Sequence, residues 1–302
     1  MKRLALYVFW EKNGIVYNYV EYYLQSLTSI AQEIVVIVNG RLSSEGRRKL
    51  EELGVVILVR ENKGLDFSAW KAALEYKGWE LVTQYDELIL CNCSCYGPLY
   101  PFSELFDVMA KRNCDFWGIN RQPKIPGKML GHIQSYFYVF RNPVLSSACF
   151  RQWWDNLVSA RSYKEEVWEH EMQFSTYLEK NGYRSDTYMD YDKYLLLSPT
   201  GGFDKHLADF QLIFGRNPLL KRRTILEKAL KSLKVLELID KLTSYPVDYI
   251  YADMARNIPH SLPALWRMWM AACFCSGRAR QTRLVFAKKI MLLRKWTKDK
   301  RI

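Results

Sequence analysis

The sequence lacks the short motifs that mark several large enzyme classes. None of the patterns GxGxxG, GxxxxGKS, GxxxxGKT, GxSxG or HExxH occurs in its 302 residues, and only four histidines are present. These patterns are typical of dinucleotide-binding enzymes, P-loop proteins, α/β-hydrolases and zinc proteases. Their absence disfavours all four classes, so the chemistry must be sought in other polar residues.

Long apolar runs and paired cysteines are also missing. The longest apolar run near the C-terminus, Met268–Cys275, has eight residues, whereas roughly 20 are needed to cross a bilayer. Leu4–Trp10 is ended by Glu11 with no cleavage site after it, so we expect a first strand rather than a targeting signal. Seven cysteines is an odd number, and Cys91, Cys93 and Cys95 have no histidine or second CxxC at zinc spacing nearby. We therefore expect buried thiols in a reducing cytosol.

Apolar and basic residues are plentiful. Hydrophobic residues make up 49% of the chain and aromatic residues 15%, which is ample for a large core. The net charge is +12, but residues 221–302 alone carry 19 Lys and Arg against 6 Asp and Glu. The chain therefore consists of a nearly neutral body, predicted as a domain over residues 1–220, and a basic amphipathic helical segment over residues 221–302.

Apolar runs alternate with helical patterns through the first half of the chain. Strands are predicted at Leu4–Phe9, Ile34–Val38, Val55–Val59 and Glu87–Cys91, separated by helices at Val16–Leu27, Ser43–Leu53 and Phe67–Tyr76. This order predicts an α/β fold with a mostly parallel sheet flanked by helices. The strands are uniformly apolar, as strands buried on both faces are.

Later elements are predicted from the same patterns. These are helices at Glu104–Arg112, Val144–Leu157, Tyr163–Asn181 and Leu219–Leu242, a half-buried strand at Gln134–Phe140, and a loop at Tyr245–His260.

Two polar loops follow neighbouring predicted strands. The first contains Asn62, Gly64 and Asp66; glycine allows a positive φ there, and the aspartate suits a helix N-terminus. The second contains Asn92, Cys93 and Ser94. Parallel strands end at one edge of a sheet, so these loops predict a ligand-binding crevice.

The segments ENKGLDFSAWKAAL, YDELILCNCSCYGPLYP, DFWGI, HIQSYFYVF and NPLLKR occur in this order between about Glu61 and Arg222. Over this span the chain resembles the bacterial rhamnan synthesis protein F family. The resemblance implies a GT-A-like fold and a glycosyltransferase, in particular a rhamnosyltransferase of cell-surface polysaccharide synthesis. The implied donor is a nucleotide sugar such as dTDP-rhamnose, and the implied acceptor is a lipid-linked glycan.

The resemblance also implies roles for individual residues. Donor binding is assigned to Asn62, Gly64, Asp66, Asn92, Cys93, Ser94 and Lys221, and acceptor binding to His132, Gln134, Ser135 and Tyr136. The catalytic base of an inverting transfer would be Glu171. In the alternative reading, Asn62 closes a turn and Asp66 caps a helix. Similarly, Glu171 would be a solvated charge like Glu165, Glu166 and Glu169, and the acceptor residues would form the polar face of a strand.

A divalent metal, Mg²⁺ or Mn²⁺, is the cofactor implied by a GT-A fold. Cys93 stands where the family is expected to carry an aspartate, and a neutral thiol is a poor ligand for these ions. Either Asp66, Ser94 and His206 hold the metal, or Lys221 with Arg222 and Arg223 neutralises the diphosphate. A third alternative is that neither arrangement exists. The chain would then be inactive and would act as a scaffold in polysaccharide assembly.

The basic C-terminal segment predicts a location. Leu262, Trp266 and Trp269 fall on one helical stripe among Lys and Arg, as in helices that lie on anionic membranes. We therefore expect a cytoplasmic protein, peripheral on the inner face of the cell membrane. No recognised nucleic-acid motif accompanies the basic run, so nucleic acid is not an expected partner. In the alternative reading, the segment is a helical appendage that packs on the body and has a solvated outer face.

Overall fold

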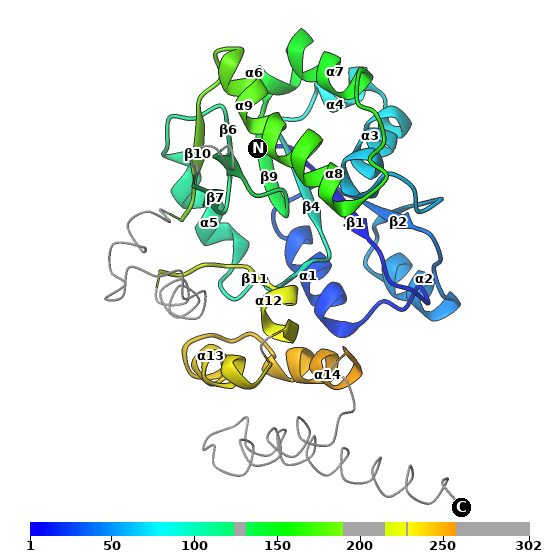
Figure 1. The fold of residues 1–302 in the computed structure, drawn as a ribbon, viewed down its shortest axis with the longest axis vertical. Coiled ribbons are helices and arrows are strands. Elements are labelled where there is room, and N and C mark those ends of the chain that lie inside the picture. Colours follow the sequence, from blue (N-terminus) through cyan, green and yellow to red (C-terminus); the bar gives the residue numbers. More distant parts are fainter. Residues whose placement is uncertain (124–130, 190–214, 228, 258–302) are drawn as a thin grey trace, which may run out of the picture.

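A computed structural model describes residues 1–123, 131–189, 215–227 and 229–257 of the chain (Figure 1). Its centre is a seven-stranded sheet with the strand order β10-β6-β9-β4-β1-β2-β3. The strands are β1 (Arg3–Phe9), β2 (Glu33–Asn39), β3 (Val56–Arg60), β4 (Glu87–Asn92), β6 (Phe116–Gly118), β9 (Phe137–Arg141) and β10 (Ser185–Thr187). All neighbours are parallel except β9, which is antiparallel to both β4 and β6. The predicted class, a mostly parallel sheet flanked by helices, is confirmed.

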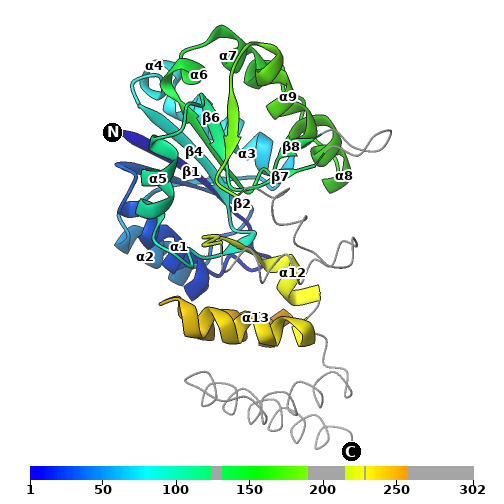
Figure 2. The ribbon, with the colours of Figure 1, turned by 90° about the vertical axis from the view of Figure 1, so that its left-hand side faces the viewer.

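Both faces of the sheet are covered. Along β1, Ala5, Tyr7 and Phe9 belong to one core cluster, whereas Leu4, Leu6 and Val8 belong to the other. The first face carries α1 (Asn18–Thr28), α2 (Ser44–Glu52) and α5 (Phe102–Ala110), and the second carries α3 (Leu65–Lys77), α4 (Trp79–Val82), α6 (Asn142–Leu145) and α7 (Ala148–Asp155). Figure 2 shows α1, α2 and α5 on the side of the sheet opposite the later helices α8 and α9. Burial on both faces explains why the strands are uniformly apolar.

The predicted helix Tyr163–Asn181 is present, with an unusual centre. It consists of α8 (Tyr163–Glu165), a π-helix (Glu166–Glu171) and α9 (Met172–Lys180). A π-helical segment is rare and often occurs at functional sites, because it redirects side chains within a helix.

The predicted strand Gln134–Phe140 is wrong at its start. Gln134, Ser135 and Tyr136 lie in a turn between β8 (His132–Ile133) and β9, and β8 pairs with β7 (Arg121–Gln122). The strand proper, from Phe137 onward, is buried rather than half-buried, because β4 and β6 flank it and helices cover it. The alternation of polar and aromatic residues therefore came from a turn and not from a strand face.

The C-terminal part of the described chain also differs from expectation. The segment predicted as one helix, Leu219–Leu242, is a short strand β11 (Leu220–Lys221) followed by α12 (Arg222–Glu227) and α13 (Ala229–Leu242). The predicted loop Tyr245–His260 is wrong, since α14 occupies Val247–Asn257. Pro246 lies just before α14, where a proline breaks no helical hydrogen bond.

These C-terminal elements pack on the body. β11 pairs with β5 (Cys95–Tyr96), and Tyr22 of α1 contacts Tyr245 with 5.1 Å between ring centroids. Asp253 of α14 is fully buried and accepts a hydrogen bond from Tyr96 Oη at 2.7 Å. The predicted boundary at residue 220 therefore falls inside a region of close contact. Among the described residues, no helix is long and apolar enough to span a bilayer.

Candidate functional site

The first polar loop needs the glycine that the sequence places in it. Gly64 has φ 75° and directly precedes α3. A Cβ atom there would lie 2.2 Å from Ser68 Oγ and 2.8 Å from Ser159 Cβ, closer than real contacts allow. Glycine is thus required for the backbone angle, as predicted, and the structure shows that it is also required for space. It brings α3 against the segment that precedes α8.

The two predicted loops meet. Asn92, at the end of β4, donates from Nδ2 to Asp66 Oδ2 at 2.7 Å. Its other side-chain atom, Oδ1, accepts from the backbone N of Ser94 at 3.1 Å and from Ser94 Oγ at 2.6 Å. Three of the predicted donor-binding residues therefore form one hydrogen-bonded unit at the edge of the sheet.

The Asp66 carboxyl group is strongly perturbed. Its pKa is raised from 3.8 to about 7, chiefly because the group is removed from water and further because the charge of Glu166 lies nearby. The hydrogen bond from Asn92 acts in the opposite direction, and Glu171 adds a further rise. A perturbed carboxyl beside two others is a frequent mark of a functional site. Glu171 therefore lies near enough to Asp66 to act on it electrostatically, although the two are far apart in the sequence.

Sequence reasoning missed the buried pair Glu166 and His170. Glu166 Oε1 accepts from the backbone N of Phe67 in the first turn of α3 at 2.9 Å, and Oε2 lies 2.9 Å from His170 Nδ1. Both side chains are buried, so Glu166 is not the solvated charge of the alternative reading. A carboxylate at a helix N-terminus is favoured by the helix dipole. The pair ties the π-helix to the loop that carries Asp66; its i, i+4 spacing was the only sequence signal.

The predicted base lies beside the predicted acceptor residues. Glu171 is half-buried at the junction of the π-helix and α9, and its Oε1 accepts from the backbone N of Ser135 at 2.8 Å. Its charge also contributes, after burial, to a raised pKa of Tyr163. The turn of residues 134–136 is therefore held against the carboxylate that would accept a proton.

The cations near the crevice have different surroundings. Lys221 Nζ lies 5.0 Å from the ring centroid of Tyr136, which links the predicted donor and acceptor residues. Arg222 already has an acidic partner, because its Nη2 donates to buried Asp253 at 3.2 Å. Arg223 is exposed and forms an ion pair with Glu227 at 2.6 Å. Of these three, Lys221 is best placed to meet an anionic group.

The remaining predicted residues lie in different settings. Asn62 is exposed and makes no side-chain hydrogen bond to another described residue. His132 is buried in β8, whereas Gln134 is half-buried, and its backbone N donates to Asn120 O at 2.9 Å. His206 lies outside the described residues.

The described donor atoms do not fit Mg²⁺ or Mn²⁺. Cys93 has a pKa raised to about 11, mainly by burial, and its Sγ accepts from Trp10 N at 3.4 Å. It is a neutral thiol that contacts the end of β1. No group of three or more His, Cys, Asp and Glu in the described chain is arranged to hold a metal ion. Hard divalent cations prefer several charged oxygens, and Asp66 alone among the predicted ligands described here supplies one.

The chain is similar to several known proteins. A curated relative, the uncharacterized protein y4gN of Sinorhizobium fredii (strain NBRC 101917 / NGR234), is 27% identical over 133 residues, which are 43% of this chain and 34% of the relative. The chain thus spans about a third of that protein's length.

Two solved structures show partial similarity. HddC from Yersinia pseudotuberculosis matches with a TM-score of 0.37 and 9% identity, covering 56% of this chain and 86% of that one. Glucosyl-3-phosphoglycerate synthase from Mycobacterium tuberculosis, in complex with Mn²⁺, UDP-glucose and phosphoglyceric acid, matches with a TM-score of 0.32 and 11% identity, covering 47% and 58%. Both TM-scores lie below 0.5, so the assignment rests on the family.

The family model described as rhamnan synthesis protein F matches residues 34–277. This span includes both polar loops, the Glu166–His170 pair, Glu171, and the elements from β11 to α14 that pack on the body. The chain therefore belongs to the rhamnan synthesis protein F family.

Proposed function

We propose that the chain is a glycosyltransferase that moves a sugar from a nucleotide-sugar donor to a growing cell-surface polysaccharide. Family membership supports a role in polysaccharide synthesis, and L-rhamnose is the sugar that the family description suggests. The observation that carries the proposal is the contact of Glu166 with Phe67 N, which ties the π-helix ending at Glu171 to the helix turn that carries Asp66 and its Asn92–Ser94 partners. One crevice thus offers groups for a donor and a carboxylate for an acceptor.

The donor would lie against the two loops. Asn92 and Ser94 supply amide and hydroxyl groups, and Asp66 can accept or donate a hydrogen bond because its pKa of about 7 permits both protonation states. Lys221 would face the diphosphate, since Arg222 and Arg223 are paired with Asp253 and Glu227 whereas Lys221 lies over the Tyr136 ring. Asn62, Gly64 and Cys93 would complete the donor side.

The acceptor would lie on the side of the turn Gln134–Tyr136 and His132. In a single inverting displacement, the acceptor hydroxyl attacks the anomeric carbon of the donor sugar while the sugar–phosphate bond breaks and the nucleotide diphosphate leaves. Glu171 accepts the proton of the attacking hydroxyl. The backbone N of Ser135 holds Glu171 in place at 2.8 Å.

A test of this mechanism is the variant Glu171→Gln, which keeps the shape and the hydrogen bond from Ser135 but cannot accept a proton. We expect transfer from dTDP-rhamnose to fall by about 10²-fold or more, the usual contribution of a general base. The matched control is Glu75→Gln, which removes an exposed carboxylate of α3. Nucleotide release would be measured for both, and undiminished activity in Glu171→Gln would remove it as the base.

A second candidate function, a scaffold without activity, is favoured by the neutral Cys93 thiol. Thermal-shift measurements with dTDP- and UDP-sugars, with and without Mn²⁺, separate the two, because a specific ligand raises the melting temperature. No shift with any donor would support the scaffold. A shift that requires Mn²⁺ would show that residues outside the described part, such as His206, complete a metal site.

The acceptor and location form a further part of the proposal. We infer a lipid-linked glycan acceptor and a cytoplasmic protein held on the inner membrane face by residues 262–302. Changing Lys288, Lys289, Arg294 and Lys295 together to glutamate should abolish flotation of the full chain with vesicles rich in anionic lipid, because the attraction depends on positive charge. Unchanged flotation would contradict a membrane role for this segment.

A further inference from the structure

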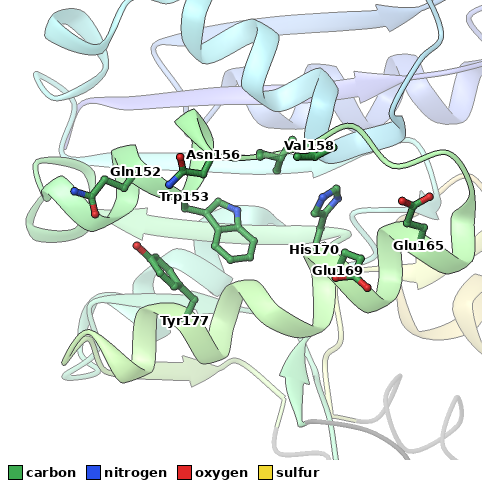
Figure 3. A pocket seen from close by; sticks show the side chains of 9 residues that line it. Gln152, Trp153, Asn156, Val158, Glu165, Glu169, His170 and Tyr177 are labelled. Atoms are coloured by element: carbon green, nitrogen blue, oxygen red, sulfur yellow. The ribbon is translucent and has the colours of Figure 1, made fainter.

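A pocket lies between α7 and the helical run from α8 to α9 (Figure 3). Its volume is about 490 Å³, within the usual range for small-ligand pockets. Its lining includes no residue assigned to the donor, the acceptor or the base. It therefore needs an explanation of its own.

An aromatic platform forms one wall of the pocket. The indole of Trp153 stacks on Phe174 with 5.0 Å between centroids, and Tyr177 lies 5.1 Å away. Tyr177 is fixed in turn, since its hydroxyl donates to Cys149 O at 3.1 Å. Figure 3 shows the indole between Tyr177 and His170. Rings held in this way offer a rigid apolar surface at little entropic cost.

A buried donor in this wall has no partner. Trp153 Nε1 is buried and makes no hydrogen bond to any other described residue. Trp117 and Trp154 also have buried, unpaired Nε1 atoms, so the pocket offers Trp153 as a ring surface and not as a hydrogen-bond donor.

The rim of the pocket supplies both donors and acceptors. The side chains of Gln152, Asn156 and Glu169 are exposed and make no hydrogen bonds to described residues. Amides both donate and accept, and carboxylates accept, which together matches hydroxyl groups. Glu165 and Glu169 also place negative charge at the rim, which disfavours phosphate and hence a nucleotide.

We propose that this pocket is a second carbohydrate-binding site, which holds one neutral sugar residue of a glycan chain away from the reacting end. The inference rests on the proposed function in that the glycan is the polysaccharide being extended. A sugar fits the accessible features: its C–H face packs on the indole, and its hydroxyls meet the amides and the carboxylates.

The pocket and the crevice share one structural element. His170 lines the pocket, while its Nδ1 contacts Glu166, which accepts from Phe67 N next to Asp66. The π-helix Glu166–Glu171 therefore has the pocket on one side and the predicted base at its end. A glycan bound in the pocket lies beside the segment that positions Glu171.

The test uses the full chain and a trisaccharide of α-linked L-rhamnose, with affinity measured by calorimetry and contacts by saturation-transfer NMR. Trp153→Ala removes the ring that forms the platform, and the double variant Gln152→Ala/Asn156→Ala removes exposed amides without disturbing the core. Each should weaken binding by about tenfold, as expected for a lost ring contact or for lost hydrogen bonds. Gln25→Ala, an exposed amide on α1 across the sheet, is the matched control and should bind normally.

The outcomes separate this inference from the proposed function. Absence of saturable binding by the wild type, or equal affinity in the pocket variants, would overturn the second site. Choline is tested as well, because a cation could also bind an aromatic surface with an acidic rim. If the wild type bound choline and not the trisaccharide, and the same variants abolished this binding, the assignment to carbohydrate would be overturned. Binding of dTDP-rhamnose is measured separately and should persist in the pocket variants. If the proposed function were wrong, the wild type would bind the trisaccharide but not dTDP-rhamnose.

Discussion

Replacing Asp66 with asparagine should stabilise the protein in a way that depends on pH. In the folded chain, burial and the charges of Glu166 and Glu171 raise the pKa of Asp66 from 3.8 to about 7. Below about pH 3.8 the group is protonated in both the folded and the unfolded state. As the pH rises, the unfolded chain loses this proton first, so the contribution of Asp66 to stability declines and is lost once the pH passes about 7. The asparagine side chain would retain the bond with Asn92 and would not titrate.

The magnitude follows from the same values. The interval between 3.8 and about 7 spans about three pH units, and each corresponds to about 1.4 kcal/mol in the free energy of unfolding. The variant should therefore gain up to about 4 kcal/mol over the wild type at pH 8. Near pH 4 the two proteins should be almost equally stable.

Urea unfolding at whole pH units from 4 to 8 measures this difference. Asp107→Asn is the control for the loss of one negative charge, since Asp107 is exposed on α5. The decisive quantity is the difference in unfolding free energy between the two variants, because other titrating groups cancel in it. If that difference were constant from pH 4 to pH 8, the raised pKa of Asp66 would be refuted.

Two further substitutions test the framework of the site. Gly64→Ala should lower the free energy of unfolding by about 1–3 kcal/mol more than Gly54→Ala does, because both glycines have positive φ but only at Gly64 would a Cβ clash; equal losses in urea unfolding would argue against the clash. Asp253→Ala should cost about 3–5 kcal/mol, because it leaves the Arg222 charge and the Tyr96 hydroxyl without their buried acceptor. A loss below about 1 kcal/mol would mean that this ion pair does not hold α14 on the body.

Local patterns in the sequence predicted the parallel sheet and the place of the crevice. Apolar runs, the turn residues between them and Gly64 are properties of neighbouring residues, so their consequences can be read without a structure. The resemblance to the family then assigned Asp66 and Glu171 to opposite sides of one site. In the structure the loop of Asp66 is tied to the π-helix that ends at Glu171, and the roles of both residues remain predictions.

Other features depend on residues that are distant in the chain. The turn at residues 134–136 exists because β9 must pair between β4 and β6, which no local pattern expresses. Likewise, α14 forms because its buried face packs against α1, although its flanking prolines suggested a loop.

The site itself shows the same division. A glutamate–histidine spacing in the sequence cannot tell whether Glu166 points to solvent or accepts from Phe67 N, since that depends on how α3 and the π-helix pack. The Asp66 pKa likewise arises from burial and from carboxylates about a hundred residues away. The sequence determined which residues could carry chemistry. Tertiary packing decided which of them lie close enough to change one another's pKa, because desolvation and proximity exist only in the folded chain.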